Sequence, residues 1–134
     1  MKNIFILLFA SISIVSCSQK KEGVQNISVS EYQNLVHDNA IVLDVRTVDE
    51  TNQGQIKGSS SLDFYESNFE NSLSLIQKDK EVFVYCQSGG RSKKAAKLLM
   101  EMGQFKVYNI EGGIRAWKAK GYELTTPSES KGNN

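Results

Sequence analysis

The chain has 134 residues, 40% of them hydrophobic and 23% charged, which is enough for one globular domain. The 16 Lys and Arg residues nearly balance the 15 Asp and Glu residues. This balance argues against a nucleic-acid-binding protein, because such proteins usually carry a basic stripe. The 2 cysteines cannot supply the disulfide framework of a small secreted scaffold.

The N-terminal segment is typical of an export signal. Lys2 precedes an apolar run, Ile4 to Val15, which is too short for a comfortable membrane span. The run ends at Val15-Ser16-Cys17, which resembles the lipobox of bacterial lipoproteins. The resemblance implies that Cys17 receives the lipid and becomes the first residue of the mature protein.

We therefore expect a lipoprotein signal peptide at 1–16 and a lipidated cysteine with a flexible tether at 17–26. The protein would be lipid-anchored in the cell envelope, on the periplasmic side or in the outer membrane. The alternative is an ordinary secretory signal followed by a coincidental cysteine. If Cys17 carries lipid, Cys86 is the only free thiol, and no internal cysteine can resolve an intermediate formed on it.

Short strands and helices alternate in the segment that follows. Ser30 with Gln33, and Thr47 with Glu50, match the capping-box pattern that begins a helix. The order predicted is a strand at 27–29, a helix from Ser30 to about His37, a buried strand at 41–45, a short helix after Thr47, a brief strand within 56–62 and a helix at 65–76.

The same alternation continues to the C-terminal end. We expect a strand at 81–85, a helix at 92–102, a strand at 106–110 and a helix at 111–120, followed by a disordered polar tail at 123–134. Strands that alternate with helices indicate an α/β fold, with a parallel sheet of about five strands flanked by helices on both faces.

Cys86 stands where such a sheet binds ligands, at the carboxyl end of a central strand. The glycines that follow allow successive N–H groups to turn toward the sulfur, and the next helix adds its positive end. This arrangement would stabilise a thiolate and lower the Cys86 pKa. The alternative is a buried structural cysteine before a turn. The candidate loop residues are Gln87, Ser88, Gly89, Gly90, Arg91 and Ser92.

Three motifs, in order and at the usual spacing, resemble those of rhodanese-like domains, and the resemblance covers about 27–122. The first motif departs from the family pattern at Gln55, where histidine is usual, and we interpret this as a local packing change. The motifs are Val42-Leu43-Asp44-Val45-Arg46 with Gly54-Gln55-Ile56-Lys57-Gly58-Ser59, Tyr85-Cys86 through Arg91-Ser92 with Ala95-Ala96, and Val107-Tyr108-Asn109-Ile110-Glu111-Gly112-Gly113 with Trp117.

The resemblance implies a sulfurtransferase of the thiosulfate type that forms a persulfide on Cys86. Its partners would be a small anionic sulfur donor and a thiol or protein acceptor, with no metal and no organic cofactor. Arg91 would bind the donor or order the loop. Asp44 and Arg46 would support the loop framework, with an ion pair to Glu50 or a neighbour. We expect a monomer that binds the membrane through the Cys17 lipid and does not bind nucleic acid.

Two other functions remain open. A non-catalytic sulfur carrier or binding module would deliver its sulfur to one partner only. A phosphatase or arsenate-reductase-like enzyme fits less well, because related phosphatases place five residues between cysteine and arginine, whereas four residues separate Cys86 from Arg91. In the family, the shorter loop fits a sulfur atom and the longer loop fits a phosphate.

Overall fold

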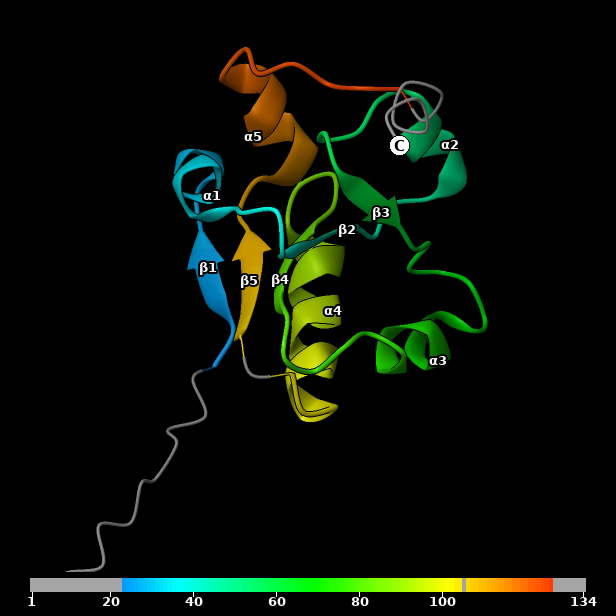
Figure 1. Ribbon diagram of the computed structural model, residues 1–134. Helices are drawn as coiled ribbons and strands as arrows, with labels where there is room; N and C mark the ends of the chain where they lie inside the picture. Colours follow the sequence, from blue (N-terminus) through cyan, green and yellow to red (C-terminus); the bar gives the residue numbers. More distant parts are fainter. Residues whose placement is uncertain (1–22, 105, 127–134) are drawn as a thin grey trace, which may run out of the picture.

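A five-stranded sheet, with all its strands parallel, forms the centre of the molecule in the computed structural model, which describes residues 23–104 and 106–126 (Figure 1). The strand order is β1-β5-β4-β2-β3. The strands are β1 (Gln25–Ile27), β2 (Ile41–Asp44), β3 (Ser59–Ser61), β4 (Glu81–Tyr85) and β5 (Lys106–Ile110). This arrangement confirms the predicted fold class, with β5, β4 and β2 inside the sheet and β1 and β3 at its edges.

Helices cover both faces of the sheet, and a separate apolar cluster lies under each layer. On one face, α3 (Phe69–Ser74) and α4 (Gly90–Glu101) pack over Leu43, Val82 and Val84. On the other face, α1 (Val29–Leu35) and α5 (Gly113–Ala119) bury Tyr32, Ile114 and Trp117 against Phe83. Figure 1 shows α1 beside α5, and α4 beside α3. The short helix α2 (Val48–Asn52) follows β2.

The sequence predicts the central strands and the start of α2 correctly. The Thr47 side chain caps Glu50 N–H and the Glu50 carboxylate caps the Thr47 N–H, so this capping box is confirmed. The predicted box at Ser30 is wrong, because Ser28 and Glu31 form it instead. Both pairs match the pattern, but Glu31 also places a negative charge in the first turn, where the helix dipole favours it.

Other boundaries also differ from the prediction. Strand β1 begins at Gln25, so the last two residues of the predicted tether belong to the sheet. Helix α3 is shorter than 65–76, because Asp63 accepts a hydrogen bond from the Tyr65 N–H and holds a turn there. Within the predicted disordered tail, Thr125 forms a bridge to Gln55. Predictions on 1–22, including the Cys17 anchor, and on 127–134 lie outside the described residues.

Candidate active site

Cys86 lies at the carboxyl end of β4, and only 1% of its surface is exposed. The chain turns directly after it, with Gly89 in the left-handed conformation at φ 109° before α4 begins at Gly90. The Gly89 N–H donates to the Cys86 Sγ at 3.1 Å, and the Ser92 Oγ lies 3.5 Å from the same sulfur. The loop therefore directs donors at the sulfur, as the sequence predicts.

These donors decide the direction of the Cys86 pKa shift. Burial of the thiol acts to raise its pKa, because a thiolate loses hydration there. Hydrogen bonds from the Ser92 hydroxyl and from the N–H groups of Ser92, Gly89 and Ser88 outweigh burial, so the pKa lies below its ordinary value. The loop thus favours the thiolate, which is the nucleophilic form of cysteine.

The start of α5 supports the loop from the other side. The Ile114 N–H donates to the Cys86 carbonyl at 2.9 Å, and the Arg115 N–H donates to the Gln87 carbonyl at 3.1 Å. The approach requires glycine, because a Cβ on Gly113 would lie 2.1 Å from the Cys86 carbonyl oxygen. The glycine pair Gly112-Gly113 therefore allows the start of α5 to approach the Cys86 backbone closely.

Arg91 pairs with Glu50 of α2 through two hydrogen bonds of 2.8 Å each. Its guanidinium also lies 5.8 Å from the centre of the Tyr65 ring. The hydrogen bonds to Glu50 are the main cause of a raised Arg91 pKa, and the Cys86 thiolate contributes to it. A permanent positive charge therefore lies near the sulfur, and α2 fixes its position.

Arg46 pairs with a neighbour, one of the two alternatives expected for it, and not with the Glu50 carboxylate. Its guanidinium instead bonds Asp44, with the shortest contact 2.6 Å from Nη2 to Oδ2, and it donates to the Gly54 carbonyl at 2.7 Å. Asp44 is fully buried and Arg46 is 3% exposed, so each buried charge is compensated by its partner in the ion pair. This pair supports the backbone beside the Cys86 loop. None of the contacts found among the described residues joins Asp44 or Arg46 to Cys86.

Glu50 should give the protein a pH-dependent stability. The Arg91 hydrogen bonds, chiefly, lower the Glu50 pKa to about 2 from an ordinary value of 4.5. The stabilisation that the Glu50–Arg91 pair gives the folded protein is therefore complete above pH 4.5 and is lost as the pH falls toward 2. Glu50→Gln should destabilise the protein by about 1 kcal/mol at pH 7, and the difference from wild type should narrow below pH 4.5.

Urea unfolding at several pH values measures this difference. Glu101→Gln is the matched control, because Glu101 lies on the exposed side of α4 and its carboxylate is 3.8 Å from Lys97. If the loss of unfolding free energy in Glu50→Gln stays constant from pH 7 to pH 3, the pairing with Arg91 does not lower the Glu50 pKa.

The substituted position Gln55 lies in a packed, hydrogen-bonded environment. Gln55 is 6% exposed, its Nε2 donates to the Ser61 Oγ at 2.5 Å, and its backbone pairs with Thr125. Ser59 hydrogen-bonds the hydroxyl of buried Tyr85 at 2.9 Å. These contacts connect the first motif to β3 and β4, and none of them involves the Cys86 sulfur.

Asn109 is a residue of the site that the sequence did not single out. It lies in β5, is 3% exposed, and its Oδ1 accepts from the Ser92 Oγ at 2.6 Å. The available signal was its position near the carboxyl end of a central strand, the edge where ligands bind.

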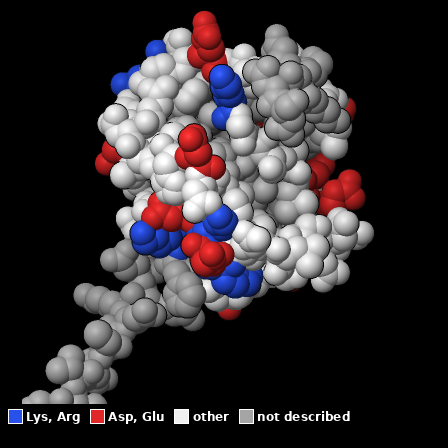
Figure 2. Space-filling model, viewed as in Figure 1, with Lys and Arg blue, Asp and Glu red and all other residues white. Residues whose placement is uncertain are grey.

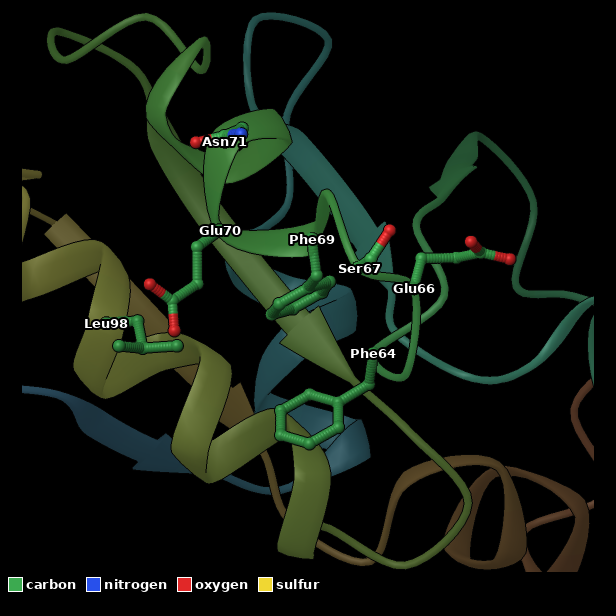
Figure 3. A pocket seen from close by; sticks show the side chains of 7 residues that line it. All are labelled: Phe64, Glu66, Ser67, Phe69, Glu70, Asn71 and Leu98. Atoms are coloured by element: carbon green, nitrogen blue, oxygen red, sulfur yellow. The ribbon is translucent and has the colours of Figure 1, made fainter.

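A hollow of about 370 Å³ lies away from the cysteine loop, where α3 and the segment before it face α4 (Figure 3). The rings of Phe64 and Phe69 form part of its wall, with their centres 5.0 Å apart. The carboxylates of Glu66 and Glu70 also line it, so an anion would be repelled. It contains none of the predicted site residues.

Positive and negative side chains are mixed on the visible surface of the molecule. On the face shown in Figure 2, basic and acidic side chains are interspersed and no single basic stripe forms. Within residues 23–104 and 106–126, no group of three or more His, Cys, Asp and Glu side chains is placed to hold a metal ion. No helix in these ranges is long and apolar enough to cross a membrane.

The sequence profile of the rhodanese-like domain matches residues 28–120, which include the Cys86 loop and both supporting motifs. The chain belongs to the rhodanese-like family. Its fold agrees with this assignment. A rhodanese-related protein from Thermoplasma volcanium is similar in structure, with a TM-score of 0.67 and 29% identity over 75% of this chain and 97% of that one.

Two sequence relatives carry sulfurtransferase names. A sulfurtransferase from Allochromatium vinosum is 36% identical over 67% of this rhodanese-like chain and 82% of its own length. Thiosulfate sulfurtransferase 18 from Arabidopsis thaliana is 32% identical over 90% of this chain and 97% of its own length. The similarity thus extends over most of the first relative and nearly the whole length of the second.

Proposed function

We propose that the protein is a sulfurtransferase that moves a sulfane sulfur from a small anionic donor, with thiosulfate as the first candidate, to a thiol or protein acceptor. The observation that carries the proposal is the Cys86 sulfur, held at 3.1 Å from the Gly89 N–H in a loop that lowers its pKa. The names of the two sequence relatives support the same chemistry.

The reaction has two displacements at sulfur. The Cys86 thiolate attacks the outer sulfur of thiosulfate; a new S–S bond forms, the bond within thiosulfate breaks, and sulfite leaves with the electron pair. A nucleophilic acceptor then attacks the outer sulfur of the persulfide, and the Cys86 thiolate leaves. The loop N–H groups stabilise the negative sulfur in both steps.

Arg91 contributes positive charge near the Cys86 sulfur, and its pairing with Glu50 fixes its position. Its four-residue separation from Cys86 favours sulfur over phosphate, since related phosphatases use a loop that is one residue longer. The described part of the chain contains one cysteine, Cys86, so the acceptor must come from outside the domain.

Initial rates with thiosulfate and cyanide test the proposal. A covalent persulfide that forms before the acceptor reacts predicts ping-pong kinetics, with parallel double-reciprocal lines as both substrates are varied. Intersecting lines would contradict it. Formation of a persulfide without turnover to small acceptors would instead support a sulfur carrier that serves one protein partner.

The proposal includes an envelope location, which rests on the sequence of residues 1–17 alone. Fatty-acid labelling that appears in the wild type and disappears in Cys17→Ser would support it, and equal labelling of both would exclude this anchor.

A further inference from the structure

A chain of hydrogen bonds leads from the Cys86 sulfur to the edge of the sheet. The Ser92 Oγ lies 3.5 Å from the sulfur and 2.6 Å from the Asn109 Oδ1, and the Asn109 Nδ2 donates to the Asn26 Oδ1 at 2.9 Å. Ser92 is fully buried and Asn109 is 3% exposed, whereas Asn26 is exposed on the edge strand. The chain therefore connects the reacting atom to the surface.

Strand register explains why the two amides meet. Strands β1 and β5 lie side by side (Figure 1). Asn26 and Asn109 are direct partners in this parallel pair, so their side chains leave the sheet on the same face. Ser92 then reaches Asn109 from the first turn of α4. The three side chains come from three elements, and the sheet fixes their spacing.

The Ser92 hydroxyl has one hydrogen and three acceptors within reach. These are the Asn109 Oδ1 at 2.6 Å, the Gly89 carbonyl at 3.1 Å and the Cys86 sulfur at 3.5 Å. When the hydrogen points at Asn109, the sulfur does not receive it. The orientation of the Asn109 amide therefore decides whether the Ser92 hydroxyl can donate a hydrogen bond to the Cys86 thiolate.

Rotation of both amides end for end reverses the chain and leaves the heavy atoms in place, because a carboxamide offers an acceptor and a donor of similar shape. Asn26 then donates to the Asn109 oxygen, and Asn109 donates to the Ser92 Oγ. The hydroxyl hydrogen is released from Asn109, and a negative sulfur attracts it more strongly than the neutral Gly89 carbonyl does. The same side chains can thus form two hydrogen-bonding patterns. In one, Ser92 donates to Asn109, as fits a neutral sulfur; in the other, Ser92 donates to the sulfur, as fits a thiolate.

We propose that Asn109, oriented by Asn26, is a positioning residue that turns the Ser92 hydroxyl toward Cys86 whenever the sulfur is negative. The role in turnover rests on the proposed function, because the thiolate is both the attacking and the leaving group there. No proton moves along the chain; the amides rotate, and the thiol proton goes to solvent. The hydrogen bond from Ser92, which lowers the Cys86 pKa, is the bond that this rotation strengthens.

Asn26→Asp tests the proposal from the far end of the chain. A carboxylate only accepts, so Asn109 must donate to it and must turn its own oxygen toward Ser92, which withholds the hydroxyl hydrogen from the sulfur. We expect the Cys86 pKa to rise by about 0.5–1, a loss of about threefold to tenfold in alkylation rate below the pKa. Asn26→Ala leaves Asn109 free to rotate and should keep the wild-type pKa.

The measurement is the rate of iodoacetamide reaction against pH, on the full chain with Cys17→Ser so that Cys86 is its one thiol. It requires no sulfur donor, so it succeeds or fails independently of sulfur transfer. The Asn26→Asp effect should vanish in a Ser92→Ala background and in an Asn109→Ala background, each of which interrupts the chain. Two such backgrounds keep the test informative if one variant does not fold.

Two results would overturn the proposal. The first is an unchanged Cys86 pKa in Asn26→Asp. The second is an equal rise with and without the Ser92 hydroxyl, since that would be a direct effect of the added charge on the thiolate.

Discussion

Gly113→Ala is expected to destabilise the protein by about 3 kcal/mol and to displace the Cys86 loop. Gly113 has φ +50°, where an L residue is strained, and an added Cβ would lie 2.1 Å from the Cys86 carbonyl oxygen and 2.9 Å from its carbon. Both partners are backbone, so no side-chain rotation relieves the overlap. Relief requires α5 to move from the loop, with loss of the Ile114 hydrogen bond to Cys86.

Gly121→Ala separates conformational strain from this overlap. Gly121 has φ +73°, but no atom lies within 4 Å of an added Cβ. Gly121→Ala should therefore lower the free energy of unfolding by only about 1 kcal/mol. Chemical unfolding of both variants gives the comparison, with the Cys86 alkylation rate as a report on the loop. If the two variants lose equal stability, the close approach at Gly113 is not the cause.

The sequence predicted well what depends on local pattern. The apolar run of β4 and its cysteine, followed by two glycines and a helix, specify the strand-to-loop transition because few other structures accept that order. The start of α2 also followed from one capping box. The second box was misplaced because Ser28 and Ser30 each have a suitable partner three residues later, so the pattern alone does not choose between them.

Contacts between distant elements were harder to predict. Glu50 was one of the partners expected for Arg46, which is four residues away, yet its carboxylate reaches Arg91, 41 residues away. The choice depends on where α2 lies relative to the loop, which no local pattern contains. Asn109 was overlooked for the same reason, since its importance arises from the register of β1 with β5.

Cys86→Ser is expected to abolish sulfur transfer, with a loss of about 10³-fold or more in turnover. The hydroxyl is isosteric enough to keep the fold but is a poor nucleophile toward sulfur and forms no persulfide. Cys17→Ser is the matched control: it removes the other cysteine, which lies outside the predicted domain, and should retain activity. Loss of turnover in both variants would point to a shared folding defect.

Intact mass of the full chain before and after thiosulfate tests whether Cys86 carries the transferred sulfur. With Cys17→Ser as the common background, Cys86 is the one thiol present. A persulfide on Cys86 should add one sulfur, about 32 Da, to this protein; cyanide should remove it, and the Cys86→Ser variant should show no gain. The absence of any gain, or an equal gain without Cys86, would contradict the assignment of Cys86 as the sulfur carrier.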